Sequence, residues 1–296
     1  MGIAKKLVTN KIRKKVGTPL EAGAAGLALI GAFIIASEFE KNDLEYAYYE
    51  VDGAGKVSDN VRLVFLSDLH EKSFGEANEE LLEMVRKADP DAVMIGGDMI
   101  VSSKKNAFKP RTSTALALCR RLAEEYPVFY GNGNHEQRLT DGSFRKTIED
   151  MGITYLSNET ADWKYNISVS GLDLEHDQYL PVAPKDPDEH FIEKRLGAMP
   201  QDGRFRIMLS HSPLFIKNYA DYGANLILTG HFHGGTIRIA PEVGLMTPQY
   251  QFFNTNVVGE RHYGASTMII SSGLGTHSIN IRINDKPQVV VVDIKK

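Results

Sequence analysis

The sequence predicts a mixed α/β fold that contains a substantial amount of β-sheet. In the middle of the chain, short apolar runs typical of buried strands alternate with stretches of helical spacing. Towards the carboxy terminus the apolar runs lose the helical period. The composition is globular, with 42% hydrophobic and 24% charged residues among 296. This composition excludes a disordered tail protein, a collagen-like repeat and a polytopic membrane protein.

The charge distribution divides the chain into a basic amino-terminal flank, residues 1–21, and an acidic body. The first twenty residues contain six Lys or Arg residues and no acid, which leaves 28 basic and 38 acidic residues for the rest. An acidic body argues against a nucleic-acid-binding protein, which would present a broad basic face. The single cysteine, Cys119, cannot form an intrachain disulfide, so cysteine usage does not indicate a redox compartment.

An uncharged stretch, residues 22–37, follows the basic flank. As a helix it would be roughly 24 Å long, shorter than the ~30 Å hydrocarbon core of a bilayer. A transmembrane signal-anchor, a cleaved secretion signal and a helix of a soluble protein are the three interpretations. We favour the anchor, because no good small-x-small cleavage site follows the stretch. The basic flank would then be cytoplasmic, and residues 38–58 would link a single-pass helix in the cell membrane to an extracytoplasmic domain at 59–296.

Strands and helices are expected to alternate in the first half of the body. Compact apolar runs at 61–66, 92–95 and 127–130 predict three strands. Two stretches between them carry apolar residues on one side of a helix: 77–88, with Leu81, Leu82 and Val85, and 112–125, with Leu116, Leu118 and Leu122.

Further strands are expected in the second half. Two apolar runs at 205–209 and 225–228 resemble the earlier buried strands. Two more at 267–271 and 289–294 have no helical period, which makes the carboxy end mostly β. The pattern as a whole predicts a mixed α/β domain.

Five of the apolar runs stop at a polar motif, and the motifs contain Asp, His and Asn residues. They are Ser67-Asp68-Leu69-His70, Gly96-Gly97-Asp98, Gly131-Asn132-Gly133-Asn134-His135-Glu136, Ser210-His211-Ser212 and Thr229-Gly230-His231-Phe232-His233-Gly234-Gly235. Ligands of open α/β sheets bind beyond the carboxyl ends of the strands. The motifs therefore can converge on one site.

The residue types in these motifs indicate metal chemistry. Carboxylate, imidazole and amide ligands suit Mn, Fe or Zn ions, and a single cysteine excludes a structural zinc site made of four thiolates. The motifs offer more ligands than one four-coordinate ion needs, whereas two ions that share a carboxylate would use them. Two ions roughly 3.5–4 Å apart are a known arrangement for phosphoryl transfer. The glycines in the motifs let the backbone turn tightly and let an anion approach.

The ordered set SDLH, GGD, GNHE, SHSP and GHFHGG resembles the calcineurin-like metallophosphoesterase superfamily. The resemblance covers residues from about 59 to 296. It implies a two-sheet β sandwich flanked by helices. It also implies a centre of two divalent metal ions, of which Mn, Fe and Zn are the candidates.

The same resemblance assigns a role to each motif residue. The first ion would be held by Asp68, His70, Asp98 and His233, and the second by Asp98, Asn134, His211 and His231, with Asp98 as the bridge. His135 corresponds to the family histidine that does not bind metal and that acts on the leaving oxygen. A metal-bound hydroxide would be the nucleophile.

One departure from the superfamily pattern narrows the function. The phosphoprotein phosphatases of the superfamily read Gly-Asp-x-x-Asp-Arg-Gly, but Val101 stands at the second aspartate here and the arginine is missing. This argues against a protein phosphatase. The short GGD motif, the GHFHGG motif and the Gly273-Leu274-Gly275-Thr276 run with Arg282 resemble the bacterial membrane-linked phosphodiesterase branch, of the YkuE and YaeI type.

The sequence thus predicts a metal-dependent phosphoric ester hydrolase, with a phosphodiesterase favoured. One alternative is a pyrophosphatase or phosphatase that acts on a nucleotide-linked or phospholipid substrate. Another is a non-catalytic metal-binding scaffold. The expected partners are a phosphoester substrate, which could be lipid-linked, and a membrane reached by the amino-terminal helix; no nucleic acid is expected.

Several residues outside the motifs could have either a functional or a purely structural role. The basic loop 104–111 could bind a second anion or be a solvated loop. The aromatic residues Tyr250, Phe252 and Phe253 could line an apolar leaving-group pocket, touch lipid or pack in the core. His176 and His277 could approach the site, whereas His190 and His262 are expected to be ordinary surface or partly buried residues.

Overall fold

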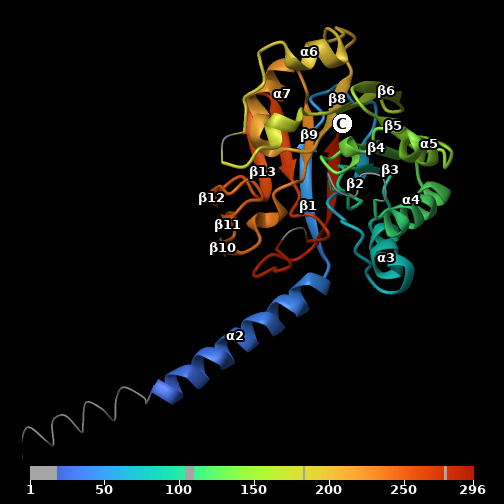
Figure 1. The fold of residues 1–296 in the computed structure, drawn as a ribbon. Helices are drawn as coiled ribbons and strands as arrows, with labels where there is room; N and C mark the ends of the chain where they lie inside the picture. The colour runs from blue at the N-terminus through green and yellow to red at the C-terminus, as the bar shows by residue number, and fades with distance from the viewer. Residues whose placement is uncertain (1–18, 104–109, 183, 277–278) are drawn as a thin grey trace, which may run out of the picture. The chain divides into compact units, whose positions relative to one another are not determined.

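The computed structural model describes residues 19–103, 110–182, 184–276 and 279–296 (Figure 1). The chain divides into two units, one that ends at Phe39 and one that comprises Glu40–Lys296. The basic flank expected at 1–21 lies almost entirely outside the described residues, as do most of the loop 104–111 and His277.

Helix α2 (Pro19–Asn42) contains the whole uncharged stretch at 22–37. None of the helices in the described part of the chain has the length and hydrophobicity required to cross a membrane. The predicted membrane anchor is therefore not confirmed. The expected linker at 38–58 is corrected in part, because strand β1 (Glu45–Asp52) forms within it and pairs in parallel with β15 (Gln288–Lys295).

The larger unit contains two six-stranded sheets. In the first, the strand order is β1-β15-β2-β3-β4-β5, with β2 (Val61–Leu66), β3 (Ala92–Ile95), β4 (Val128–Gly131) and β5 (Thr154–Leu156). Strands β2 to β5 run parallel, whereas β15 is antiparallel to β2. The strand expected at 61–66 has the observed bounds.

In the second sheet the order is β13-β14-β9-β8-β7-β6. Its strands are β6 (Glu159–Trp163), β7 (Ile167–Leu172), β8 (Phe205–Ser210), β9 (Leu226–Thr229), β13 (Gly259–Tyr263) and β14 (Ser266–Ile270). The four central strands are parallel, and the two edge strands are antiparallel to their neighbours. A three-stranded sheet of β10 (Arg238–Ala240), β11 (Val243–Met246) and β12 (Phe252–Asn254) completes the unit.

The two large sheets face one another across the central core, and helices cover their outer faces (Figure 1). Successive side chains of β2 point to opposite faces of the sheet, and both faces are buried. Leu63 and Phe65 pack against the second sheet, and Val64 and Leu66 pack under the helices. The helices on the first sheet are α3 (Glu79–Ala88), α4 (Ser113–Glu125) and α5 (Ser143–Glu149), and those on the second are α6 (Phe191–Leu196) and α7 (Ile216–Tyr222). The predicted two-sheet sandwich is confirmed.

Cys119 lies on the buried face of α4 in the outer core of the first sheet. Burial, assisted by Glu136 and Glu71, raises the pKa of its thiol to about 12. The thiolate is the reactive form, so we expect no reaction with an aromatic disulfide reagent in native buffer and one thiol per chain in denaturant. A Cys119→Ala variant supplies the blank. Labelling of the native protein within minutes would contradict the packing of α4.

Candidate metal centre

All eight predicted site residues lie beyond the carboxyl ends of five strands. Asp68 and His70 follow β2, Asp98 follows β3, Asn134 and His135 follow β4, His211 follows β8, and His231 and His233 follow β9. Because parallel strands end at the same edge of a sheet, these loops meet at one end of the sandwich. Six of the residues line a cleft, and Asp68 and His211 are buried beneath it.

Asp68, His70 and His233 form the first group of metal-ligating atoms. His233 Nε2 lies 3.2 Å from His70 Nε2 and 3.3 Å from Asp68 Oδ1, and the third side of this triangle is 4.0 Å. Ligands of one tetrahedral ion with bonds of about 2.1 Å stand roughly 3.4 Å apart. His233 Nδ1 lies 3.2 Å from the Gly275 carbonyl oxygen, an acceptor that favours a proton on Nδ1 and leaves Nε2 to a metal.

Asp98, His211 and His231 form the second group, and a further group of His70, Asp98 and His135 overlaps both. His211 Nδ1 donates to the Gly96 carbonyl at 2.7 Å, so Nε2 faces Asp98 Oδ2 at 3.2 Å. Burial lowers the pKa of His211, but the carboxylates of Asp98 and Asp68 outweigh this effect and raise it to about 10. Two electron-rich atoms at this distance need a cation between them, which is either a proton or a metal ion.

The amide of Asn134 adds a third kind of ligand to this group. Its amide nitrogen lies 3.3 Å from Asp98 Oδ2 and 3.2 Å from His231 Nδ1. An ionised carboxylate and a neutral imidazole can both accept a hydrogen bond at these atoms. Without an ion, the amide nitrogen would serve these acceptors; with an ion, the amide oxygen would turn to it. Burial, followed by the charge of His211, holds the pKa of His231 well below its ordinary value, which keeps the ring in its ligating neutral form. The residues therefore fit two ions.

Asp98 connects the two groups. Its Oδ2 atom lies 3.9 Å from both His70 Nε2 and His135 Nε2, in addition to the contact with His211. Burial alone would raise the pKa of the carboxyl, but the charge of the neighbouring His211 holds it well below its usual value. The bridging role that the resemblance assigns to Asp98 stays a prediction, and an ionised carboxylate close to both groups is what that role would require.

The backbone of the site is strained. Five of the eight site residues have a positive φ angle, which residues other than glycine rarely adopt. They are Asp68 at 54°, His70 at 47°, Asp98 at 51°, His231 at 69° and His233 at 46°. Each such residue costs of order 1–3 kcal/mol, and strain of this kind clusters at functional sites.

Comparison with known proteins agrees with this geometry. Residues 61–235, more than half of the chain, match the calcineurin-like phosphoesterase family. The chain belongs to this family. The predicted superfamily is thereby confirmed.

The individual relatives have low sequence identity to this chain, but the matches extend over most of it. The chain is 26% identical to the uncharacterized metallophosphoesterase YkuE of Bacillus subtilis, over 80% of each protein. It is 25% identical to phosphodiesterase YaeI of Escherichia coli, over 79% of this chain and 82% of that protein. It is 29% identical to a Bos taurus transmembrane protein with a metallophosphoesterase domain, over 60% of this chain and 41% of that protein. The predicted bacterial branch of YkuE and YaeI is confirmed.

The sequence reasoning assigned no role to Glu136 of this phosphoesterase. Its buried carboxylate accepts from the backbone N–H groups of Asp98 at 2.8 Å, Met99 at 3.0 Å and Gly133 at 3.0 Å, and from the Tyr130 hydroxyl at 2.8 Å. Burial and the charge of Asp98 raise the pKa of Glu136 to about 7. Glu136 joins the loops that follow β3 and β4, and its place next to His135 in the GNHE motif was the available signal.

His135 is held by backbone groups of the loop after β3. The Ser102 N–H donates to His135 Nδ1 at 2.8 Å, and the Ser102 hydroxyl donates to the His135 carbonyl at 2.6 Å. A donor at Nδ1 requires a lone pair there, so the ring proton is on Nε2, the atom that lies next to Asp98. In phosphoprotein phosphatases an aspartate orients the corresponding histidine. In this chain the backbone N–H of Ser102, which follows Val101, contacts the ring instead.

The remaining candidates lie at different distances from the centre. His176 lines the cleft together with Tyr179, whereas His190 and His262 are exposed and interact with glutamates, as expected for surface residues. Tyr250 lines a neighbouring hollow, and Phe252 and Phe253 are exposed on β12. This outcome rules out core packing for the two phenylalanines.

Replacement of Glu136 should weaken the fold. Glu136→Ala leaves three buried N–H groups without their acceptor, and we expect the free energy of unfolding to fall by about 3 kcal/mol or more. Urea denaturation measures this change. The control is Glu124→Ala in α4, where the side chain is exposed. Equal stability of the two variants would contradict the bracing role of Glu136.

Proposed function

We propose that this metal-dependent phosphoesterase hydrolyses phosphodiesters with a centre of two divalent ions. The main support for this proposal is the position of Asp98. Its ionised carboxylate belongs to one group of buried ligands and lies 3.9 Å from His70 of the other. The first ion would use Asp68, His70, Asp98 and His233, and the second Asp98, Asn134, His211 and His231. Bound ions would neutralise charge on the phosphoryl group and lower the pKa of a water molecule.

The residues of the chain supply orientation and a proton. His135 presents Nε2–H on the cleft side of Asp98, because Ser102 occupies Nδ1. A hydrogen bond from this atom to the leaving oxygen would stabilise the negative charge that develops there. Burial of Asp68 and His211 beneath the cleft keeps water away from the ligands and strengthens their electrostatic effect.

Two observations favour a diester over a monoester. Among the cleft-lining residues that the structure describes, Arg138 is the one Lys or Arg residue, and its Nη1 donates to the Ser102 carbonyl at 2.9 Å. A monoester dianion would need more positive charge than a diester monoanion. The relative YaeI carries the name phosphodiesterase. Anchorage of the chain to the cell membrane, with the catalytic domain outside the cytoplasm, stays a prediction.

The function is tested with the purified full chain and manganese. We expect faster hydrolysis of bis(4-nitrophenyl) phosphate than of 4-nitrophenyl phosphate, and loss of both activities after treatment with a chelator. A preference for the monoester would make the protein a phosphatase. Absence of both activities in protein that retains metal would favour the non-catalytic scaffold.

Two substitutions separate chemistry from metal binding. His135→Ala should lower kcat by about 10²- to 10⁴-fold, the usual contribution of a proton-transfer group, while the metal content per chain stays unchanged. Asp98→Asn should lower the metal content, because it removes the shared charge. Metal analysis and kinetics on the same samples measure both effects. Full activity of His135→Ala would refute the assigned role.

A further inference from the structure

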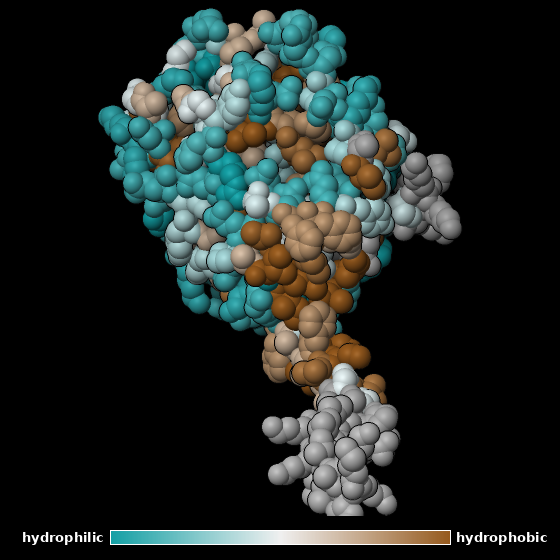
Figure 2. Space-filling view, turned by 90° about the vertical axis from the view of Figure 1, so that its left-hand side faces the viewer, coloured by the Kyte–Doolittle hydropathy of each residue, from teal (hydrophilic) through white to brown (hydrophobic). Residues whose placement is uncertain are grey.

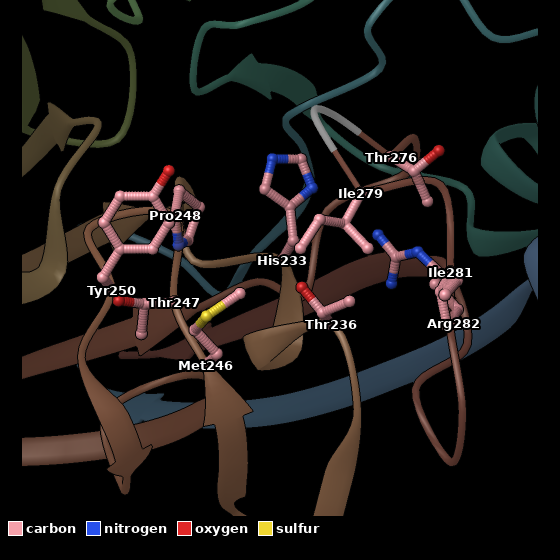
Figure 3. A pocket seen from close by; sticks show the side chains of 10 residues that line it. All are labelled: His233, Thr236, Met246, Thr247, Pro248, Tyr250, Thr276, Ile279, Ile281 and Arg282. Carbon is pink, nitrogen blue, oxygen red and sulfur yellow. The ribbon is translucent and has the colours of Figure 1, made fainter. Parts of the chain in front are cut away.

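A second hollow adjoins the metal cleft. His233 and Pro248 line both, so the hollow begins at a predicted metal ligand. Figure 3 shows the His233 ring at its centre, with Met246, Pro248 and Tyr250 on one side and Ile279, Ile281 and Arg282 on the other. Its volume is about 90 Å³ and it is partly open to solvent, so it has room for a short run of methylene groups.

Apolar side chains make up most of the exposed lining of this hollow. We call it the apolar groove and define it by Met246, Pro248, Tyr250, Ile279 and Ile281. The remaining polar side chains that line it, apart from His233 and Arg282, are threonines. A groove of this kind binds a ligand through burial of apolar surface and offers little to a strongly polar group.

The one guanidinium at the groove is engaged by the protein itself. Arg282 is buried, and its Nη2 donates to the carbonyls of Ser272 at 2.7 Å and Gly275 at 2.7 Å. Its Nη1 donates to the Asp285 carboxylate at 3.0 Å. These hydrogen bonds direct both terminal nitrogens of Arg282 to acceptors of the protein, so the guanidinium offers little to a second phosphate or a sugar nucleotide.

Exposed apolar side chains lie at Tyr250, which lines the groove, and at residues close to it in the sequence or in hydrogen bonding. Tyr250, Phe252 and Phe253 are 54%, 61% and 61% exposed, and Val182 is 75% exposed. Val182 is tied to the groove, because its N–H donates to the Gln249 carbonyl at 2.8 Å. Figure 2 shows a largely hydrophilic surface over the larger unit, with hydrophobic patches on it, and exposed apolar side chains along α2. Apolar patches on a protein surface mark sites of interaction.

We propose that the apolar groove binds the hydrocarbon chain of an amphiphilic phosphoester while its phosphate occupies the metal cleft. This inference rests on the proposed function and names its substrate class. Continuity through His233 and Pro248 sets the chain next to the phosphate. Aliphatic lining by Met246, Ile279 and Ile281 favours a flexible chain over a nucleobase, which needs directional polar partners.

The test measures binding and does not depend on turnover. Alkylphosphonates with one, four, six and eight carbons, below their micellar concentrations, are titrated calorimetrically into the manganese-loaded full chain. Burial of each methylene should tighten binding by up to about fourfold until the groove is filled. Met246→Ser and Ile279→Ser should flatten this dependence and leave the affinity for methylphosphonate unchanged. Ile239→Ser, an exposed residue of β10 outside the groove, is the matched control and should behave like the wild type.

The outcomes separate this inference from the proposed function. Affinity that is independent of chain length, or a dependence that survives both groove substitutions, overturns the inference whether or not the protein hydrolyses diesters. Chain-independent affinity together with binding of the protein to neutral phosphatidylcholine vesicles would assign the exposed rim to membrane contact and likewise overturn it. Hydrolysis of methyl and octyl 4-nitrophenyl phosphodiesters then tests turnover, and failure of both would count against the proposed function alone.

Discussion

The metal centre depends on the buried carboxylate of Glu136. It binds backbone N–H groups on both sides of the gap between the loops after β3 and β4, and so fixes Asp98 relative to Asn134 and His135. Burial raises the pKa of Glu136 to about 7, and repulsion from the neighbouring carboxylate of Asp98 adds to this effect. Four hydrogen bonds to Glu136 offset that cost. These bonds hold the residues of the two loops in place relative to one another.

Bracing between loops also explains how the strained backbone persists. The Asp68 N–H donates to the Gly97 carbonyl at 2.9 Å, and the His70 N–H donates to the Asp98 carbonyl at 3.1 Å, so the loops after β2 and β3 hold each other. Glycine is required where the loops after β3 and β4 approach each other most closely. A Cβ at Gly133 would collide with the Asp98 carboxylate, and Gly97 has a φ of 86°. Packing of the two sheets thus supports conformations that isolated loops would not keep.

The sequence predicted the site better than the fold around it. Polar motifs at the ends of strands were expected to converge, because ligands of α/β sheets bind there. The resemblance to the superfamily then assigned roles to eight residues of these motifs. Edge strands such as β6 and β12 escaped prediction because their residues are largely exposed and lack an apolar run. The bracing by Glu136 could not be derived, since its partners lie on separate loops. The apolar groove joins residues near 246 and 281 that no local pattern connects.

The amide that replaces a carboxylate at His135 bears on the chemistry. A carboxylate accepts a proton from the imidazole and stabilises the doubly protonated ring, whereas the Ser102 N–H and the nearby Arg138 guanidinium both present donors to Nδ1. A proton on Nδ1 would point at the hydrogens of these two donors, and the repulsion would disfavour the protonated ring. The geometry therefore favours His135 as a neutral hydrogen-bond donor through Nε2, with most of the charge compensation left to the groups around Asp98. Such a site is suited to a leaving oxygen that already tolerates negative charge, and an apolar wall beside it would select the substrate by its organic part.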